Sequence, residues 1–294
     1  PMTDDDLAEL LAPAASAPSE ASLQSGFETL APVVVRIHRV TPAQAVRICK
    51  WAKRLPRLDV LADVTLLHGS MAVELVAETV RRHALESRVR IIQFTSKDME
   101  REYPSIASPT VQHYQMLPFM SHAWAFTSEA IVACGLGRDA MPCGASQHCW
   151  IFEHDCDVAG PIDEFVRAYV EDPADLIAKE LVPKEAMAKE WMWYDCATLP
   201  FMRQYAEHRC CAHVHAIRVS SRLLRSLHVA AKEGRVGFGE MSIPTVCVGE
   251  GLTWRPLREA HIGDPYSPHG YLDREGFEAR EHACDGKLYH ALKW

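Results

Sequence analysis

The segment HCWIFEHDCDVAG, residues His148–Gly160, joins a hydrophobic run to a dense group of ionisable side chains. Its first half is apolar and aromatic, as expected of a buried strand. Glu153, His154, Asp155 and Asp157 then follow within five positions. Because neighbouring carboxylates repel one another, a strand that ends in this way needs a cation or solvent to stabilise the charges.

Asp155 and Asp157 are separated by one residue, so in a turn that leaves a strand both can point toward one position. Such oxygen ligands suit a hard divalent cation, Mg²⁺ or Mn²⁺, which keeps further positions for water or phosphate oxygens. A solvated acidic turn is the alternative interpretation, since acidic residues are common in turns. If the backbone stays extended, His154 points to the opposite face and is left out of the ligand set, whereas Glu153 shares the face of Asp155 and could support it.

The elements that would position these residues follow an alternating pattern. Hydrophobic, β-branched runs predict four strands, and helical patterns come between them. Thr41 is placed to cap the helix after the first strand, with Pro42 at its first position. Strands that alternate with helices favour an α/β fold with a mostly parallel, Rossmann-like sheet. The predicted strands are Pro32–Val40, Asp63–Ser70, Arg88–Ser96 and 147–155, and a further helix is expected over 121–136.

The second half of the chain is less regular. A helix is expected over 160–172, a short strand over 174–181, and a strand that runs into a helix over 212–234. We expect a flexible leader over residues 1–25 and a single domain over 26–294, with a nucleotide-type first half (26–160) and a smaller, mixed, substrate-shaping second half (161–294).

Composition excludes several classes of function. The chain has 294 residues and a formal net charge of −8 with scattered basic residues, which argues against a nucleic-acid partner. No apolar run approaches the roughly 20 residues of a membrane helix, so no membrane span is expected. The 10 cysteines form no CxxC pair and the chain has no asparagine, which favours a reducing compartment and predicts a cytoplasmic protein. No GxGxxG and no P-loop motif occurs.

Three segments, together with the acidic pair, resemble the GT-A class of metal-dependent nucleotide-sugar glycosyltransferases. CDVAGPIDEFVRAYVEDPADLIAKEL resembles the passage from the DxD motif to a core strand in that class. GFGEMSIPT resembles the segment with the acidic catalytic residue, and LYHALK resembles the C-terminal segment with a metal-binding histidine. The resemblance extends from about Val33 to Lys293. It departs from the common pattern in two places, because no proline follows the late histidine and no glycine-rich acceptor loop is evident.

The resemblance implies a role for each matching residue. Asp155, Asp157 and His290 would bind Mn²⁺ or Mg²⁺, and Mn²⁺ is favoured because imidazole is a nitrogen ligand. Glu240 would be the general base of an inverting transfer to a hydroxyl acceptor, since a partly desolvated carboxylate suits that task. A retaining mechanism remains open if Glu240 is not the base.

The donor would be a nucleotide-sugar, with a UDP-sugar favoured because UDP is the commonest donor nucleotide in the class. Arg36 and His38 would contact the nucleotide at the end of the first strand, and His68 would do so at the second. Lys293 would pair with diphosphate oxygens. Trp191, Trp193 and Tyr194 are candidates for stacking against an acceptor glycan, although aromatic residues more often pack in the core.

Two other functions fit part of the pattern. A phosphohydrolase or nucleotidyltransferase could use the same aspartate pair without the late histidine segment. A non-catalytic module could bind a nucleotide-sugar in the same fold without turnover.

Overall fold

The computed structural model describes residues 30–107, 131, 148–186, 205, 207–266 and 272–294. The predicted leader and the aromatic residues Trp191, Trp193 and Tyr194 lie outside the described residues, as does nearly all of the helix predicted over 121–136.

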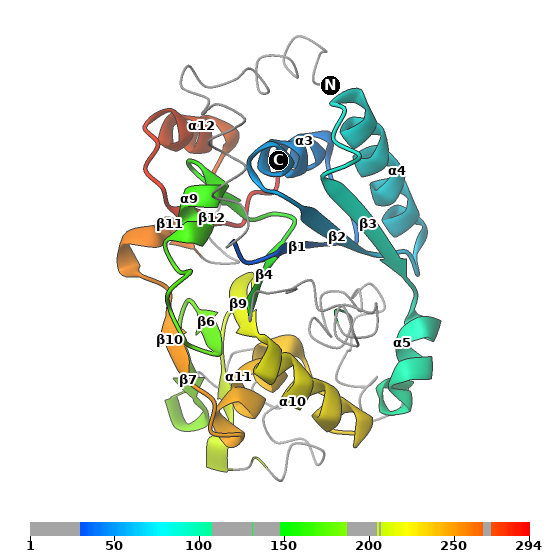
Figure 1. The fold of residues 1–294 in the computed structure, drawn as a ribbon, viewed down its shortest axis with the longest axis vertical. Coiled ribbons are helices and arrows are strands. Elements are labelled where there is room, and N and C mark those ends of the chain that lie inside the picture. The colour runs from blue at the N-terminus through cyan, green and yellow to red at the C-terminus, as the bar shows by residue number, and fades with distance from the viewer. Residues whose placement is uncertain (1–29, 108–130, 132–147, 187–204, 206, 267–271) are drawn as a thin grey trace.

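A seven-stranded sheet forms the centre of the molecule, with helices on both faces (Figure 1). Six of its strands run in one direction, and β9 alone is antiparallel to its neighbours β4 and β6. The architecture is therefore α/β with a mostly parallel sheet, compatible with a Rossmann-like fold. In sheet order the strands are β10 (Trp254–Pro256), β6 (Leu176–Ala178), β9 (Ala216–Ser220), β4 (His148–Glu153), β1 (Val33–Ile37), β2 (Leu58–Asp63) and β3 (Val89–Phe94).

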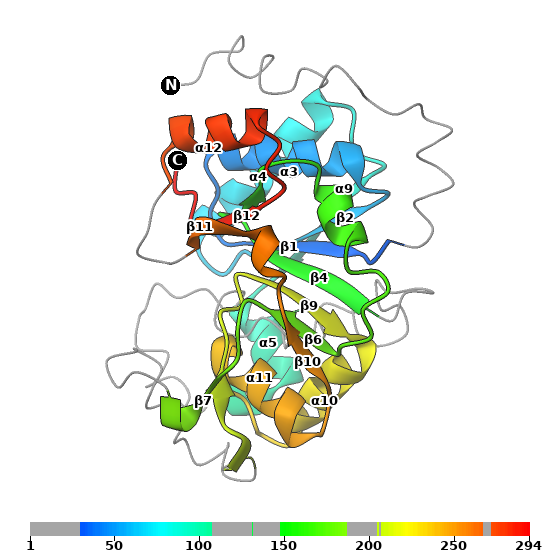
Figure 2. The same cartoon turned by 90° about the vertical axis from the view of Figure 1, so that its left-hand side faces the viewer.

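Hydrophobic cores lie on both faces of this sheet, as expected for parallel strands that helices cover on both sides. Side chains of β1 alternate between the two cores, with Val33 and Val35 in one and Val34 in the other. The first core contains residues of α3, α4 and α9, and the second contains residues of α5, α10 and α11 (Figures 1 and 2). The helices are α3 (Pro42–Arg54), α4 (Leu67–Arg82), α5 (Ser96–Glu102), α9 (Ile162–Arg167), α10 (Ser221–Lys232), α11 (Gly239–Gly249) and α12 (Arg274–His282), and the 3-10 helices are η1 (Pro104–Ala107), η3 (Lys184–Ala186) and η6 (Glu259–His261).

Two small sheets complete the fold. A three-stranded sheet pairs β12 (Leu288–His290) with β11 (Ile262–Tyr266) in parallel and with β5 (Asp157–Val158) in antiparallel orientation. The strands β7 (Val182–Pro183) and β8 (Cys210–Cys211) form an antiparallel pair. The three-stranded sheet matters for function, because it carries the C-terminal segment to the exit of β4.

The predicted second strand is wrong in position. The strand β2 ends at Asp63, and the LLHGS sequence begins helix α4, so His68 lies in the first helical turn. Every residue of β2 is buried, whereas Leu67 is 77% exposed. Gly69 allows the helix to start close to the strand, since a Cβ atom there would lie 1.9 Å from the carbonyl oxygen of Asp63. Leu66 and Leu67 thus resemble part of a buried strand in the sequence, although both side chains are exposed.

The other predicted elements that fall within the described residues lie close to their predicted positions. Thr41 caps α3 with a complete capping box, in which its hydroxyl accepts from the amide of Gln44 at 3.2 Å. The chain passes from β9 directly into α10, and Gly234 follows that helix with a φ of +83°. The sheet is continuous across the predicted boundary at residue 160, because it includes β9, β6 and β10 beside β4.

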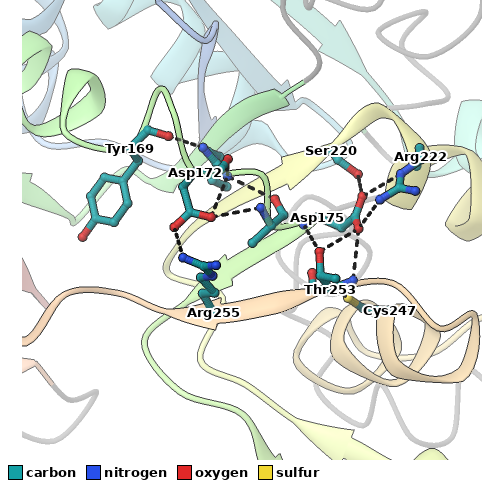
Figure 3. A network of polar contacts seen from close by, with 10 residues as sticks. Tyr169, Asp172, Asp175, Ser220, Arg222, Cys247, Thr253 and Arg255 are labelled. Carbon is teal, nitrogen blue, oxygen red and sulfur yellow. Dashed lines mark hydrogen bonds and ion pairs between the residues drawn. The ribbon is translucent and has the colours of Figure 1, made fainter.

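A polar network joins the second half of the sheet (Figure 3). The carboxylate of Asp175, just before β6, accepts from Ser220, Arg222 and Thr253 at distances between 2.7 and 3.1 Å. Arg218 of β9 donates to backbone carbonyls of the segment that leads into β6, including those of Asp172 at 2.6 Å and Ala174 at 3.0 Å. The network fixes β6, β9 and the start of β10 relative to one another.

In the described part of the chain, none of the helices has the length and apolar character needed to span a bilayer.

Candidate metal centre

His290 lies between two carboxylates at the carboxyl end of β4. Its Nε2 is 3.4 Å from Oε2 of Glu153 and 3.5 Å from Oδ1 of Asp155, and all three residues are buried. Among the described residues, two groups of three ligand atoms within 4.8 Å of one another share His290, one with Glu153 and His215 and the other with Asp155 and Cys156. The late histidine therefore meets Asp155, as predicted, although the two are far apart in sequence.

Backbone pairing holds this arrangement. Glu153 is the last residue of β4, and Asp155 follows one residue later. The strand β12 pairs with β5, so Tyr289 lies opposite Asp157. The amide of Leu292 then donates to the carbonyl of Asp155 at 2.8 Å. The C-terminal segment is thus fixed along the turn that leaves β4, which places His290 beside the acidic residues.

Arg36 binds Glu153 on the neighbouring strand. The two residues are register partners in the parallel pair β1–β4, and the guanidinium donates to Oε1 of Glu153 at 2.8 Å. It also donates to the carbonyl of Val214 at 3.1 Å. Both side chains are buried, so the guanidinium offsets the charge of Glu153 and orients its carboxylate. The predicted contact of Arg36 with a nucleotide stays a prediction.

Two histidines that the sequence analysis did not single out belong to the same cluster. Nδ1 of His215 is 3.2 Å from Oε2 of Glu153, and the ring of His215 stacks on that of His290. His213 stacks on His215 with ring centroids 5.3 Å apart. The His-x-His spacing just before β9 was the available signal, because alternate residues of an extended segment share a face.

Glu240 lies at the edge of this histidine stack, in the first turn of α11. Its Oε1 is 4.0 Å from Nδ1 of His213, and the side chain is buried. Burial and the nearby charge of Glu153 raise the pKa of Glu240 to about 8. With a pKa of about 8, the carboxyl group is mostly protonated at pH 7, and its ionised form is a stronger base than an ordinary carboxylate.

The charges around His290 stabilise its protonated form. Burial alone would lower the pKa of His290, but its contacts with Asp155 and Glu153 outweigh burial and raise it to about 9. Burial likewise opposes ionisation of the two carboxyl groups. For Glu153, the charges of His215 and Arg36 outweigh burial and hold the pKa well below its usual range. For Asp155, the contact with His290 and the charge of His154 lower the pKa. Both carboxyl groups are therefore ionised, and each is paired with a positively charged side chain.

The structure does not bring the predicted ligand Asp157 into a group with His290, although its Oδ2 is buried without a hydrogen-bond partner in the described structure. Its Oδ1 accepts from Nε1 of Trp51 and from the amide of Val158, both at 2.8 Å. Among the described residues, it belongs to none of the three-ligand groups. The reason is local, because the chain forms the short strand β5 at Asp157 and pairs with β12 there. The acidic pair that meets His290 is Glu153 and Asp155.

Lys293 contributes a second cation at Asp155. Its Nζ contacts Oδ2 of Asp155, and the lysine is largely exposed at the edge of the site. The predicted role of Lys293 at a diphosphate remains a prediction. Its position, exposed and beside Asp155, places a positive charge where an anionic ligand could reach it.

Three histidines gather beside this centre. The ring centroid of His38 lies 5.0 Å from that of His154 and 6.3 Å from that of His68. Burial, followed by the charge of His154, lowers the pKa of His38 to about 3, so its ring is neutral. His154 takes no part in the ligand groups of the described residues. The two predicted nucleotide contacts, His38 and His68, thus lie together although one comes from a helix.

Each carboxylate lies near the distance expected for a ligand that shares a divalent cation with His290. Cis ligands of an octahedral ion with bonds near 2.1 Å lie about 3 Å apart, and Nε2 of His290 is 3.4 Å from Glu153 and 3.5 Å from Asp155. Among the described residues, Glu153 and Asp155 meet His290 in separate ligand groups, so one ion bound by all three would require the two carboxylates to approach each other. In the described structure, Oδ1 of Asp155 is buried without a hydrogen-bond partner and lies 3.5 Å from Nε2 of His290. Two carboxylate oxygens and one imidazole suit Mn²⁺. Cys156 is a poor fourth ligand, because burial raises the pKa of its thiol, which donates to the carbonyl of His215.

No protein-family model and no curated protein matches this sequence. The geometry of the buried cluster is therefore the basis for a functional conclusion.

Proposed function

We propose that this protein is a metal-dependent glycosyltransferase of the GT-A type, which moves a sugar from a nucleotide-sugar donor to a hydroxyl acceptor. The observation that carries the proposal is the position of His290 between Glu153 and Asp155. A histidine from the C-terminal segment and two carboxylates at the end of a central strand form one candidate cation site. Glu240, the proposed base, lies within 4.8 Å of a ring nitrogen of His215, whose ring stacks on that of His290.

The fold supports this proposal in a general way. A mostly parallel α/β sheet binds ligands at the carboxyl ends of its strands, and the candidate centre lies at the carboxyl end of β4 beside β1. The segments whose sequences resemble the GT-A class come from three separate parts of the chain. Their key residues, Asp155, Glu240 and His290, lie in or beside one cluster. A phosphohydrolase would not need that convergence.

The chain's own residues divide the chemistry between them. Glu153, Asp155 and His290 would hold Mn²⁺ or Mg²⁺, and the bound ion would neutralise charge on the diphosphate that leaves. Lys293 would add a positive charge on the exposed side of Asp155. Glu240 would accept the proton of the acceptor hydroxyl as the new glycosidic bond forms.

The resemblance favours a UDP-sugar as donor and a glycan or other hydroxyl compound as acceptor. A direct displacement with Glu240 as base inverts the anomeric centre. His38 and His68 lie beside the centre at the carboxyl edge of the sheet and would contact the nucleotide.

A donor panel tests this proposal. About ten nucleotide-sugars are incubated with the protein and Mn²⁺, with and without EDTA, and release of the nucleoside diphosphate is measured. We expect release from one donor or a few related donors, and EDTA should abolish it. Release of inorganic phosphate or pyrophosphate instead would indicate a phosphohydrolase or nucleotidyltransferase. Donor binding without any release would indicate a binding module, and both outcomes would overturn the proposal.

A further inference from the structure

A second group of ligand atoms lies beside the candidate centre and leaves His290 out. It consists of His213, His215 and Glu240, whose ligand atoms lie within 4.8 Å of one another. Nδ1 of His213 is 4.0 Å from Oε1 of Glu240, and the two imidazole rings are stacked at 5.3 Å with planes 23° apart. Because the rings of His213 and His215 are nearly parallel, ring nitrogens on their edges can point in similar directions.

The backbone holds the three residues together. His213 and His215 are two positions apart in the segment that enters β9, which puts both on one face of the chain. The amide of Ala212 donates to the carbonyl of Glu240 at 2.9 Å, so this segment is tied to the first turn of α11. The backbone of the group is thus tied into the second half of the fold.

Each imidazole also has a carboxylate that orients it. Nε2 of His213 is 3.4 Å from Glu180, which leaves Nδ1 facing Glu240. Nδ1 of His215 is 3.2 Å from Glu153. Histidines that bind metals usually donate their other N–H to a carboxylate, which fixes the tautomer and the ring orientation. Both histidines of this group have such a carboxylate.

We propose that His213, His215 and Glu240 form a second metal site, selective for Zn²⁺. Two imidazoles and one carboxylate with an open fourth position are typical of catalytic-type zinc sites. Ligands of a tetrahedral zinc ion with bonds of 2.0–2.2 Å lie about 3.4 Å apart, so His213 and Glu240 at 4.0 Å need only a small approach. A site with two nitrogen ligands binds Zn²⁺ more tightly than Mn²⁺.

Zinc at this site has a consequence that rests on the proposed function. Ligation occupies the carboxylate of Glu240, so the general base can no longer accept a proton. Zinc therefore inhibits the transfer reaction while the manganese centre stays filled. Binding of zinc itself does not depend on which reaction the protein catalyses.

Zinc binding to the metal-free full-length chain tests the proposal. Zn²⁺ is titrated in competition with a chromophoric chelator for the wild type, H213Q, D155N and H282Q. His213 is partly exposed, and melting curves confirm that each variant is folded. His282 on the exposed face of α12 is the matched control. We expect the tightest zinc site of the wild type to keep its affinity in D155N and H282Q, and to weaken by about tenfold or more in H213Q.

Unchanged zinc affinity in H213Q would overturn the proposal, and so would loss of the tight site in D155N, because the zinc would then be bound at the His290 centre. Where transfer is measured, zinc should inhibit the wild type in the presence of excess Mn²⁺, and H213Q should need at least about tenfold more zinc for half-inhibition. Transferase activity without zinc binding would overturn this inference and leave the proposed function unaffected. Zinc binding without any transferase activity would support this inference and overturn the proposed function.

Discussion

The imidazole rings of His215 and His290 lie face to face, with centroids 3.6 Å apart and planes 11° apart. Both rings contact the same oxygen, Oε2 of Glu153, at 3.2 and 3.4 Å. Burial lowers the pKa of His215, whereas the contacts with Asp155 and Glu153 raise that of His290. A neutral imidazole therefore stacks on a charged one, and a single carboxylate orients both. Glu153 is the organising residue of the site.

Replacing Arg36 by methionine should strongly destabilise the protein. The change leaves the buried carboxylate of Glu153 without its guanidinium partner, and breaking a buried pair in this way costs about 3–5 kcal/mol. Urea denaturation measures the free energy of unfolding. The double variant R36M/E153Q should recover much of the loss, since no uncompensated charge remains.

The control for Arg36 is R274M, which breaks the more exposed pair of Arg274 with Glu278 on α12. It should change the free energy of unfolding by about 1 kcal/mol or less. If R36M were no more destabilising than R274M, the pair of Arg36 with Glu153 would not organise the site.

Replacing Glu240 by glutamine should abolish transfer and leave donor binding unchanged. The amide cannot accept the proton of the acceptor hydroxyl, so we expect kcat to fall by about 10²-fold or more. Transfer assays give kcat, and calorimetry with the nucleotide-sugar gives the affinity. E250Q, at the exposed end of the same helix, is the matched control and should retain activity. Equal activity of the two variants would remove Glu240 from the mechanism.

The Asp175 network predicts a loss of stability in acid. Burial would raise the pKa of Asp175, but hydrogen bonds from Ser220, Thr253 and Arg222 outweigh it and lower the pKa below the ordinary value of 3.8. The unfolded chain therefore takes up this proton at a higher pH than the folded protein. The contribution of Asp175 is fully present well above pH 3.8 and is lost as the pH falls through the lowered folded-state value.

Thermal melts of the wild type and D175N between pH 7 and pH 3 test this expectation. D175N should be less stable at pH 7 by about 2 kcal/mol, because charge-assisted hydrogen bonds are lost. The difference should shrink toward pH 3. E259Q, at an exposed carboxylate, should follow the wild-type curve. A difference that stays constant with pH would mean that the charge of Asp175 does not stabilise the sheet.

Periodicity predicted the first half of the central sheet and its helices, together with β6, β9 and α10, but it placed one strand wrongly and predicted none of the small sheets. The buried runs of β1 and β4, the β-branched residues of β3 and the cap at Thr41 are local signals, which the sequence shows without knowledge of tertiary contacts. The strand β2 was misplaced because Leu66 and Leu67 are apolar yet exposed, and no local pattern distinguishes a surface leucine from a core leucine.

The site was partly predictable for a related reason. The pattern of residues marked Asp155, Glu240 and His290, which the structure brings into or beside one cluster. It also suggested Asp157, because Asp155 and Asp157 are separated by one residue just as Glu153 and Asp155 are. The spacing alone does not show which of the two pairs faces His290. Which acidic residue meets His290 depends on the pairing of β5 with β12, a contact between distant segments that spacing does not encode. The role of His215 depends in the same way on its contact with Glu153.

Manganese binding to four proteins tests the central claim most directly. Mn²⁺ is titrated into the metal-free wild type, D155N, H290Q and D157N, and free Mn²⁺ is measured by electron paramagnetic resonance. We expect one site in the wild type, about tenfold or greater weakening in D155N and H290Q, and wild-type affinity in D157N, whose carboxylate is bound by Trp51. Unchanged affinity in D155N and H290Q, or a loss confined to D157N, would contradict a cation site formed by Glu153, Asp155 and His290.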